Sequence, residues 1–391
     1  MKILRVIATL NPRTGGPIEG LIRASEVMSD LGVAVEVATL DATDALPAES
    51  AALPWPLHKL GPGRFGPYCY APKFAKWLHR NVSEFDAVII HGNWQYHGFA
   101  TSKVCRKHQI PYFIYPHGML DPWFNHAYPL KKLKKQLYWR WGESPVLKHA
   151  QAVLFTCEEE CRLARQSFAP YHVREKVIGY GTSAPTLDLE AALRRFKAAP
   201  PAWARKPYIL FLGRIQEKKG IDLMVAAYAA LRSKGVELPE LVIAGPEQQP
   251  ALAERIRRDV PQDGIHWIGS ISGELKWQAL AAAEALLLIS HQENFGIVVA
   301  EALLAGTPAL ISNKVNIWRE VVRGGAGLVA EDTQAGAAEL LQRWSQLVPS
   351  QRQEMSRSAQ ALFLEAFDIR QATKRLNAFI ESEIESIADG N

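Results

Sequence analysis

Short runs of apolar and β-branched residues alternate with longer amphipathic segments along both halves of the chain. In the first half the runs are residues 3–9, 33–39, 87–90, 112–115, 152–155 and 176–179. In the second half they are residues 208–212, 241–244, 265–268, 285–289, 308–311 and 327–329. Such runs are typical of buried strands, and the intervening segments are long enough for helices. The pattern predicts an α/β fold with two Rossmann-like, doubly wound domains.

Small residues and prolines concentrate between the two halves, in residues 181–185 and 198–201. This composition is typical of an exposed linker, and a chain of 391 residues is long enough for two domains. We therefore expect an N-terminal domain in residues 1–185 and a C-terminal domain in residues 186–370. Residues 371–391 have apolar positions at helical spacing and are expected to form a final helix.

Composition and charge narrow the class of protein. The hydrophobic fraction of 48% and the charged fraction of 22% are ordinary for a globular protein. The apolar stretches at residues 3–10 and 279–289 fall short of the roughly 20 residues that cross a bilayer. Four cysteines are too few for a disulfide framework and favour a reducing compartment. We expect a cytoplasmic protein, and its net charge of +5 favours an anionic substrate or lipid surface rather than nucleic acid.

Candidate phosphate-binding groups follow the first strand of each half. Gly15 and Gly16 would let a helix N-terminus approach a phosphate, although a tight turn without a ligand is the simpler explanation of a lone glycine pair. Arg214 and Lys219 follow the run at 208–212. A planar guanidinium and an ammonium together can neutralise a diphosphate, whereas solvated loop charges are the alternative.

The segment from His291 to Pro308 carries two carboxylates eight residues apart. Glu293 follows the run at 285–289, and Glu301 lies in an apolar segment that is predicted to be helical. A charge in such surroundings requires a partner. The carboxylates and the N–H groups at the helix start could bind sugar hydroxyls, phosphate and ribose together. The alternative is that both glutamates lie on the surface.

Taken together, these elements resemble those of the retaining glycosyltransferase family 4, also called glycosyl transferases group 1, which has the GT-B fold. The matching features are Glu293 and Glu301 with Asn-Phe-Gly at 294–296, Ala-Gly-Thr-Pro at 305–308, Arg214 with Lys219, Gly15-Gly16, and Tyr-Pro-His-Gly at 115–118. The resemblance implies that the C-terminal helix crosses back to the N-terminal domain. It also implies that the N-terminal domain binds the acceptor and the C-terminal domain the nucleotide sugar.

The resemblance also implies a role for each matching residue. Catalytic roles fall on His117 and Glu293, and binding of the donor diphosphate falls on Gly15, Gly16, Arg214 and Lys219. Donor-sugar contacts would come from Glu293, Asn294, Phe295 and Gly296, and nucleoside contacts from Glu301, Trp267, Ile268 and Gly269. A structural loop histidine is the alternative for His117.

The resemblance further implies a metal-independent hexosyltransferase that keeps the anomeric configuration. The leaving diphosphate would take the acceptor proton, and the two domains would close over the donor to exclude water. No cofactor is expected, and the chain has no Asp-x-Asp motif for a metal. The donor would be a UDP- or GDP-sugar, and the acceptor a glycan or a lipid-linked saccharide.

Two segments of the first half are candidates for acceptor binding. Asn93, Trp94 and Tyr96 follow a strand and could contact a sugar ring, although turn packing explains them equally well. In residues 130–141, Leu130, Leu133, Leu137 and Trp141 form one helical stripe beside a lysine-rich face. Such a helix could lie on an anionic membrane surface, so that the protein would be peripheral on the inner face of the plasma membrane. A core-facing stripe is the slightly favoured alternative.

The most plausible setting is the synthesis of cell-surface polysaccharide, lipopolysaccharide or exopolysaccharide. A nucleotide-sugar epimerase of the same fold and a non-catalytic nucleotide-sugar-binding protein remain as alternatives. A dehydrogenase is excluded because Gly-x-Gly-x-x-Gly is missing after the first strand, and a glycosidase would not need Arg214 and Lys219. The nucleobase, the sugar, the linkage and the oligomeric state stay undefined by the sequence.

Overall fold

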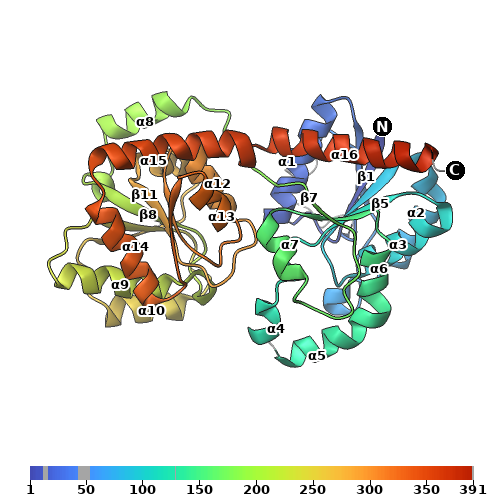
Figure 1. Cartoon of the computed structure of the whole chain (residues 1–391), viewed down its shortest axis with the longest axis horizontal. Coiled ribbons are helices and arrows are strands. Elements are labelled where there is room, and N and C mark those ends of the chain that lie inside the picture. The colour runs from blue at the N-terminus through green and yellow to red at the C-terminus, as the bar shows by residue number, and fades with distance from the viewer. Residues whose placement is uncertain (12–15, 43–52, 128, 390–391) are drawn as a thin grey trace. The chain divides into compact units, whose positions relative to one another are not determined.

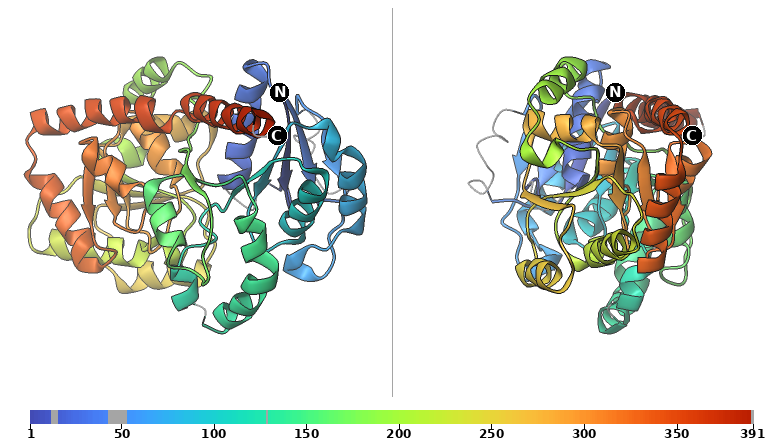
Figure 2. Two further views of the ribbon diagram at one scale, coloured as in Figure 1. Left: turned by 45° about the vertical axis from the view of Figure 1, so that its right-hand side comes forward. Right: turned by 90° about the vertical axis from the view of Figure 1, so that its left-hand side faces the viewer.

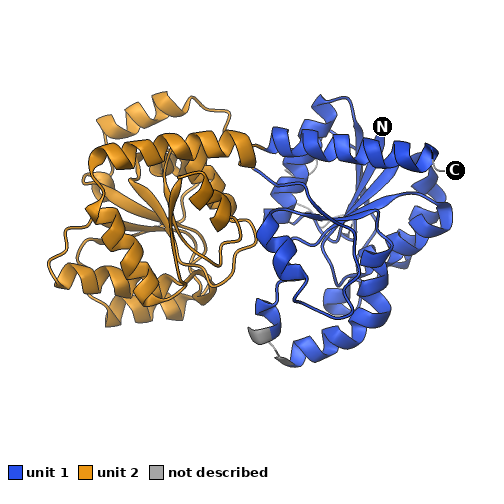
Figure 3. Cartoon of the chain, in the orientation of Figure 1, with its two compact units in different colours: residues 1–181, 369–391 blue, residues 182–368 orange. Residues whose placement is uncertain are grey.

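The computed structural model describes residues 1–11, 16–42, 53–127 and 129–389, without the side chains of 126, 127 and 129. The described chain forms two compact units (Figure 3). Unit 1 comprises Met1–Gly181 and Ile369–Asn391, and unit 2 comprises Thr182–Asp368. The change from unit 1 to unit 2 therefore falls inside the first of the two small-residue segments.

Unit 1 is built on a parallel sheet that has seven strands among the described residues, in the order β3-β2-β1-β4-β5-β6-β7 (Figure 1). The strands are β1 (Lys2–Ile7), β2 (Ala34–Thr39), β3 (Leu57–Lys59), β4 (Ala87–His91), β5 (Tyr112–Tyr115), β6 (Ala152–Phe155) and β7 (Glu175–Val177). The helices are α1 (Gly16–Asp30), α2 (Pro72–Asn81), α3 (Tyr96–His108), α4 (Trp123–Ala127), α5 (Pro129–Tyr138), α6 (Ser144–Lys148), α7 (Glu158–Ala164) and α16 (Ile369–Asp389), and η5 (Trp139–Glu143) is a π-helical turn.

Alternate residues of the strands in unit 1 point to two separate apolar layers. Leu4 and Val6 of β1 join the layer formed with α2, α3 and α6, whereas Ile3 and Ile7 join the layer formed with α1 and α16. Because both faces of the sheet are covered, its strands read as nearly continuous apolar runs. This is the reason why the hydrophobic pattern revealed them.

Helix α16 belongs to unit 1 although it ends the chain. It packs across α1, as Figures 1 and 2 show, and contributes buried Leu376 and Ile380 to the apolar layer. Glu383 forms a bidentate ion pair with Arg174, which precedes β7. The predicted return of the C-terminal helix to the N-terminal domain is confirmed.

Unit 2 repeats the doubly wound design with a parallel sheet that has six strands among the residues described, in the order β10-β9-β8-β11-β12-β13. The strands are β8 (Tyr208–Leu212), β9 (Glu240–Ala244), β10 (Ile265–Gly269), β11 (Ala285–Leu288), β12 (Ala309–Ser312) and β13 (Gly327–Ala330). The helices are α8 (Leu189–Ala198), α9 (Ile221–Ser233), α10 (Pro250–Asp259), α11 (Gly273–Ala282), α12 (Ile297–Leu304), α13 (Trp318–Arg323), α14 (Gln334–Gln346) and α15 (Pro349–Leu362). The predicted fold class is therefore confirmed.

Several strand bounds were predicted inaccurately, and one strand was missed. The first strand, for example, ends at Ile7 and not at residue 9. The last strand of the first half begins at Glu175 and ends at Val177, not at residues 176–179. Strand β3 was not predicted at all, because its three half-buried residues show no apolar run. It is held at the sheet edge by pairing of its backbone with β2 instead.

The strand order places one topological switch point in each sheet. In unit 1 the order reverses between β1 and β4, and in unit 2 it reverses between β8 and β11. Loops that leave neighbouring strands at such a point diverge, which opens a crevice at the carboxyl ends. The described candidates at these two positions are Gly16 after β1, Asn93 after β4, Arg214 after β8 and Glu293 after β11.

Candidate active site

The switch point of unit 2 brings Lys219 and Glu293 together. Lys219 ends the short 3-10 helix η7 (Glu217–Lys219), and Glu293 lies in the loop after β11. The Lys219 Nζ donates to Glu293 Oε2, with side chains that are 12% and 23% exposed. The loops are also joined through their backbones, because the His291 N–H donates to the Lys218 carbonyl at 2.9 Å. A half-buried ion pair therefore occupies the place where this fold binds ligands.

The turn between Glu293 and α12 requires glycine. Gly296 has φ of 73°, and a Cβ there would lie 3.3 Å from both Glu293 Cγ and Val315 Cγ1. Its carbonyl accepts from the Val299 N–H at 2.8 Å, which starts the helix. Phe295 is buried against Phe367. This turn holds the Glu293 backbone at the N-terminus of α12, where the helix dipole favours an anion.

Glu301 is buried inside α12 and has the partner that its environment requires. It is 5% exposed, and its Oε1 accepts from Lys276 Nζ of α11 at 2.6 Å. The alternative that Glu301 is a surface residue is therefore wrong. Lys276 is 25 residues away in sequence and is not marked by any motif, so only the packing of α11 beside α12 identifies it.

The remaining candidates of unit 2 lie near the ends of their strands. Arg214 follows β8 and its side chain is exposed. Trp267 and Ile268 of β10 are half-buried, and Gly269 ends that strand with φ of 68° and open space where a Cβ would be. Asn294 lies between Glu293 and Phe295, with its Oδ1 3.5 Å from Asn316 Nδ2. The structure brings Lys219, Glu293 and the start of α12 into direct contact.

In unit 1, His117 lies in a tight turn after β5. Its φ is 51° and that of Gly118 is 75°, both in the left-handed region. The Gly118 N–H donates to Glu160 Oε1 at 2.6 Å, and the other oxygen of that buried carboxylate accepts from the Thr156 N–H at 2.8 Å. Burial, together with the charge of Arg5, lowers the pKa of His117 to about 3, so the imidazole is neutral.

The start of α1 is held by Tyr180. Its hydroxyl lies 3.4 Å from the Gly16 carbonyl, and a Cβ on Gly20 would meet this hydroxyl at 1.6 Å. Gly16 is the first residue of α1. Gly15, the other predicted diphosphate ligand, lies outside the described residues.

The segment after β4 is bound to a buried carboxylate. Asn93 is 2% exposed and donates from Nδ2 to Glu143 Oε1 at 2.6 Å, while the Trp94 N–H donates to Glu143 Oε2 at 3.0 Å. Trp94 also packs against Trp139 and Phe168, and Tyr96 packs edge-on against Tyr70 and Tyr68. These contacts leave Trp94 and Tyr96 half-buried and Asn93 enclosed.

The described residues contain no group of three or more His, Cys, Asp or Glu side chains arranged to hold a metal. Within the same part of the chain, every helix is too short or too polar to span a bilayer.

Three residues that support the candidate site were missed by the sequence analysis. Lys276 neutralises Glu301, Glu160 holds the His117 turn, and Glu143 holds the Asn93 segment. The run Glu158-Glu159-Glu160 at a helix start was an available signal, because a carboxylate there can accept backbone N–H bonds. Glu143 had no comparable signal, since it lies in a π-helical turn that ordinary helical periodicity does not reveal.

Two models of known protein families match the chain. Residues 194–362 match the family model described as "Glycosyl transferases group 1", and residues 15–181 match that of the "Glycosyl transferase 4-like domain". Together the two matches cover most of both units.

Individual proteins show the same likeness. The chain is 28% identical over 233 residues to a D-inositol 3-phosphate glycosyltransferase of Jonesia denitrificans, covering 56% of this chain and 55% of that protein. It is 30% identical over 145 residues to the O-antigen chain mannosyltransferase B of Escherichia coli, covering 36% and 37%. The chain thus spans about half the length of the first relative and about a third of the second.

Among solved structures, HepE of Anabaena in complex with UDP has a TM-score of 0.76 at 17% identity, covering 98% of this chain and 100% of that one. At that identity the likeness supports the fold alone. With both family models matched in chain order over two Rossmann-like units, the protein belongs to glycosyltransferase family 4, the glycosyl transferases group 1.

Proposed function

We propose that the protein transfers a sugar from a nucleotide-diphosphate donor to a glycan or lipid-linked acceptor, with retention of configuration and without a metal. The observation that carries the proposal is the Lys219–Glu293 pair at the switch point of unit 2, with Arg214 exposed at the end of β8. The names of the relatives support this substrate class, since HepE was solved with UDP-glucose and one relative is an O-antigen mannosyltransferase. We therefore place the reaction in cell-surface polysaccharide synthesis.

The chemistry follows from the charges at this position. As the bond between the anomeric carbon and the phosphate oxygen breaks, negative charge develops on the leaving diphosphate. Arg214 and Lys219 supply the positive charge that stabilises it. The acceptor oxygen bonds to the anomeric carbon on the same face, and its proton passes to the departing phosphate. Because Glu293 is paired with Lys219, it acts as an acceptor for sugar hydroxyls rather than as a nucleophile.

A donor screen tests this proposal. UDP-, GDP-, ADP- and dTDP-sugars are compared for thermal shift and for release of nucleoside diphosphate, with EDTA present. We expect one nucleotide class to stabilise the protein. Arg214→Ala should lose that shift, and Glu293→Ala should lower turnover by roughly 10²–10³-fold, as for loss of one transition-state contact.

Arg258→Ala is the matched control, because Arg258 is exposed and bonded to its neighbour Asp259. It should behave like the wild type. The proposal is wrong if no nucleotide sugar shifts the melting temperature, or if the shift is the same in all variants. Turnover that EDTA abolishes would contradict the metal-independent mechanism.

A lipid-linked acceptor is supported by α5 and the following turn. The apolar stripe of Leu130, Leu133, Leu137 and Trp141 is 85%, 64%, 68% and 79% exposed. The alternative of a core-facing stripe is therefore wrong. Another side of this segment packs inward. There Trp139 is buried, and Lys135 Nζ lies 4.4 Å from the centre of the Trp94 ring. Figure 2 shows α5, in teal-green, at the periphery of unit 1.

The exposed stripe and its lysines fit an anionic lipid surface. Residues 129–141 contain four lysines and one arginine but no acidic residue. Burial of a leucine side chain is worth about 1.5–3 kcal/mol, and each lysine near an anionic surface about 1 kcal/mol. We expect sedimentation with vesicles of phosphatidylglycerol and phosphatidylcholine, and much weaker sedimentation with phosphatidylcholine alone.

A double variant with Leu133→Asp and Leu137→Asp should no longer bind the vesicles. Leu364→Asp, at a residue of unit 2 that is 61% exposed, should leave it intact. Equal binding by both variants, or equal binding to neutral and anionic vesicles, would contradict the proposed membrane surface.

A further inference from the structure

A buried arginine lies behind the candidate histidine. Arg5 of β1 is 1% exposed, and no ion pair to it exists among the described residues. Its Nη1 donates to the Leu21 carbonyl at 3.1 Å and to Ser25 Oγ at 3.0 Å, both on α1. Its Nε and Nη2 lie 3.3 and 3.2 Å from His91 Nε2. All of these partners are neutral, so a full positive charge is directed at the His91 ring.

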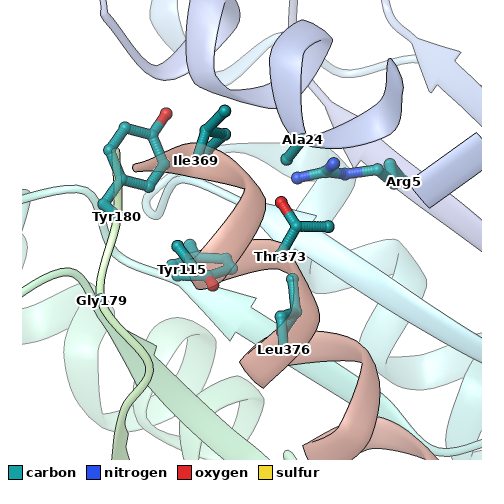
Figure 4. Close-up of a pocket in the computed structure, with 9 residues that line it drawn as sticks. Arg5, Ala24, Tyr115, Gly179, Tyr180, Ile369, Thr373 and Leu376 are labelled. Carbon is teal, nitrogen blue, oxygen red and sulfur yellow. The ribbon is translucent and has the colours of Figure 1, made fainter. Parts of the chain in front are cut away.

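The other side of this guanidinium borders a small cavity that offers no counter-charge. The cavity is lined by Arg5, Tyr115, Tyr180 and Thr373 together with apolar and glycine residues. Figure 4 shows Arg5 and the hydroxyl of Thr373 on this cavity. The Thr373 Oγ1 is buried and has no hydrogen-bond partner in the described structure, so a water molecule could bind there. Arg5 is the only charged residue of the lining, and two of its nitrogens are directed at His91 Nε2.

The hydrogen bonds determine where the protons lie. Because an arginine only donates, His91 Nε2 must accept, and the proton of the neutral ring is then on Nδ1. His91 Nδ1 lies 2.9 Å from His117 Nε2, so this proton is donated to His117. His117 accepts at Nε2 and must carry its own proton on Nδ1. Burial, Arg5 and the neighbouring histidines His97 and His117 also hold the pKa of His91 well below its usual range.

The ring of His117 is fixed in place but partly exposed. It stacks on Tyr115 and His91, with ring centroids 5.4 and 5.2 Å away, and meets Tyr180 edge-on. Its Nδ1 has no partner among the described residues, and the side chain is only half-buried. A polarised N–H donor is thus available at the carboxyl end of β5, beside the switch point of unit 1.

We propose that Arg5 is a positioning residue for sugar transfer, which through His91 fixes His117 in the tautomer that presents Nδ1–H to an oxygen of a sugar bound at the carboxyl end of β5. The inference rests on the proposed function. Successive hydrogen bonds that start from a cation polarise one another, so the terminal Nδ1–H is a stronger donor than in an isolated histidine. Because the ring is neutral, this N–H group does not act as an acid. It serves as a hydrogen-bond donor to an oxygen of the bound sugar.

The tautomer can be measured without a substrate. The ¹⁵N shifts of labelled histidine distinguish a protonated from an unprotonated ring nitrogen. We expect Nδ1–H on His117 in the wild type and in Arg5→Lys, and a mixture or Nε2–H in Arg5→Met. A wild-type His117 that carries its proton on Nε2 would overturn the proposal, whatever the outcome of the donor screen.

Kinetics separate positioning from simple structural support. Arg5→Met should lower kcat by roughly 10- to 100-fold and change KM little. This is less than the effect of removing a hydrogen-bond donor to the transition state altogether. Arg5→Lys should recover most of the activity. A folded Arg5→Met protein with normal tautomer and kcat would contradict the role of Arg5.

A second pair of variants remains informative if Arg5→Met fails to fold. His91→Asn and His91→Phe both remove the acceptor of Arg5, but only asparagine can still donate to His117 from the position of Nδ1. We expect His91→Asn to keep the Nδ1–H tautomer and more activity than His91→Phe. Equal tautomer populations in the two variants would disprove the relay.

Discussion

The ionisable side chains near the candidate residues of the two units are stabilised in different ways. In unit 2, Lys276 pairs with Glu301 and Lys219 pairs with Glu293. In unit 1, Arg5 is bonded to neutral groups, and Glu143 accepts from Asn93 and the Trp94 backbone. An ionised group without a paired counter-charge costs free energy on burial, so its pKa moves toward the neutral form. Glu143 follows this rule, because desolvation raises its pKa to about 7.

The raised pKa of Glu143 predicts a dependence of stability on pH. The folded protein keeps a proton that the unfolded chain loses near its ordinary pKa of 4.5. The free energy of unfolding should therefore fall as pH rises from about 4.5 to about 7, and this contribution should be constant above that range. The amplitude is roughly 2–4 kcal/mol.

Glu143→Gln should remove this dependence, as urea unfolding at pH 5 and pH 8 would show. Glu190→Gln is the control, since the Glu190 side chain is 90% exposed. If the free energy of unfolding changes equally with pH in the wild type and in Glu143→Gln, Glu143 is already ionised in the folded protein at pH 5.

At the scale of elements, the candidate site of unit 2 depends on how α12 begins. The loop after β11 pairs with the residues after β12 through Glu293 and Val315. It then reverses at Gly296, whose carbonyl accepts from the first turn of α12. The same short segment thus places a carboxylate, a left-handed residue and a helix N-terminus together.

Gly296→Ala should weaken binding of the nucleotide sugar as well as stability. A left-handed φ costs alanine about 1–2 kcal/mol, and the new Cβ would press on Glu293 and Val315. Gly235→Ala is a matched control, because Gly235 has φ of 79° with open space around its Cβ position. Both variants should lose melting temperature, Gly296→Ala more than Gly235→Ala, but only Gly296→Ala should raise the donor Kd. An unchanged Kd would mean that the α12 turn does not contact the donor.

At the scale of the whole molecule, unit 1 is not a continuous stretch of sequence. It is completed by α16, which follows all of unit 2 and covers one face of the N-terminal sheet beside α1. Leu376 and Ile380 are buried in that apolar layer, and Glu383 pairs with Arg174. The stability of unit 1 should therefore depend on the packing of α16.

Truncation of Ile380 to alanine tests this dependence. Because Ile380 is fully buried, Ile380→Ala should lower the free energy of unfolding by about 2–5 kcal/mol. Glu385→Ala, at an exposed position of the same helix, should change it by less than about 0.5 kcal/mol. Equal stability of the two variants by denaturant unfolding would show that α16 adds little to unit 1.

Hydrophobic patterning by itself determined the two parallel sheets and the final helix, because strands covered on both faces read as apolar runs. The motif residues likewise marked Glu293, Lys219 and His117 as candidates. Tertiary structure alone decided how they are held. Lys276 meets Glu301 through helix packing, Glu143 meets Asn93 across 50 residues, and Arg5 meets His91 across two neighbouring strands. The outward direction of the α5 stripe was also undetermined, because periodicity shows that a helix has an apolar side but not what covers it.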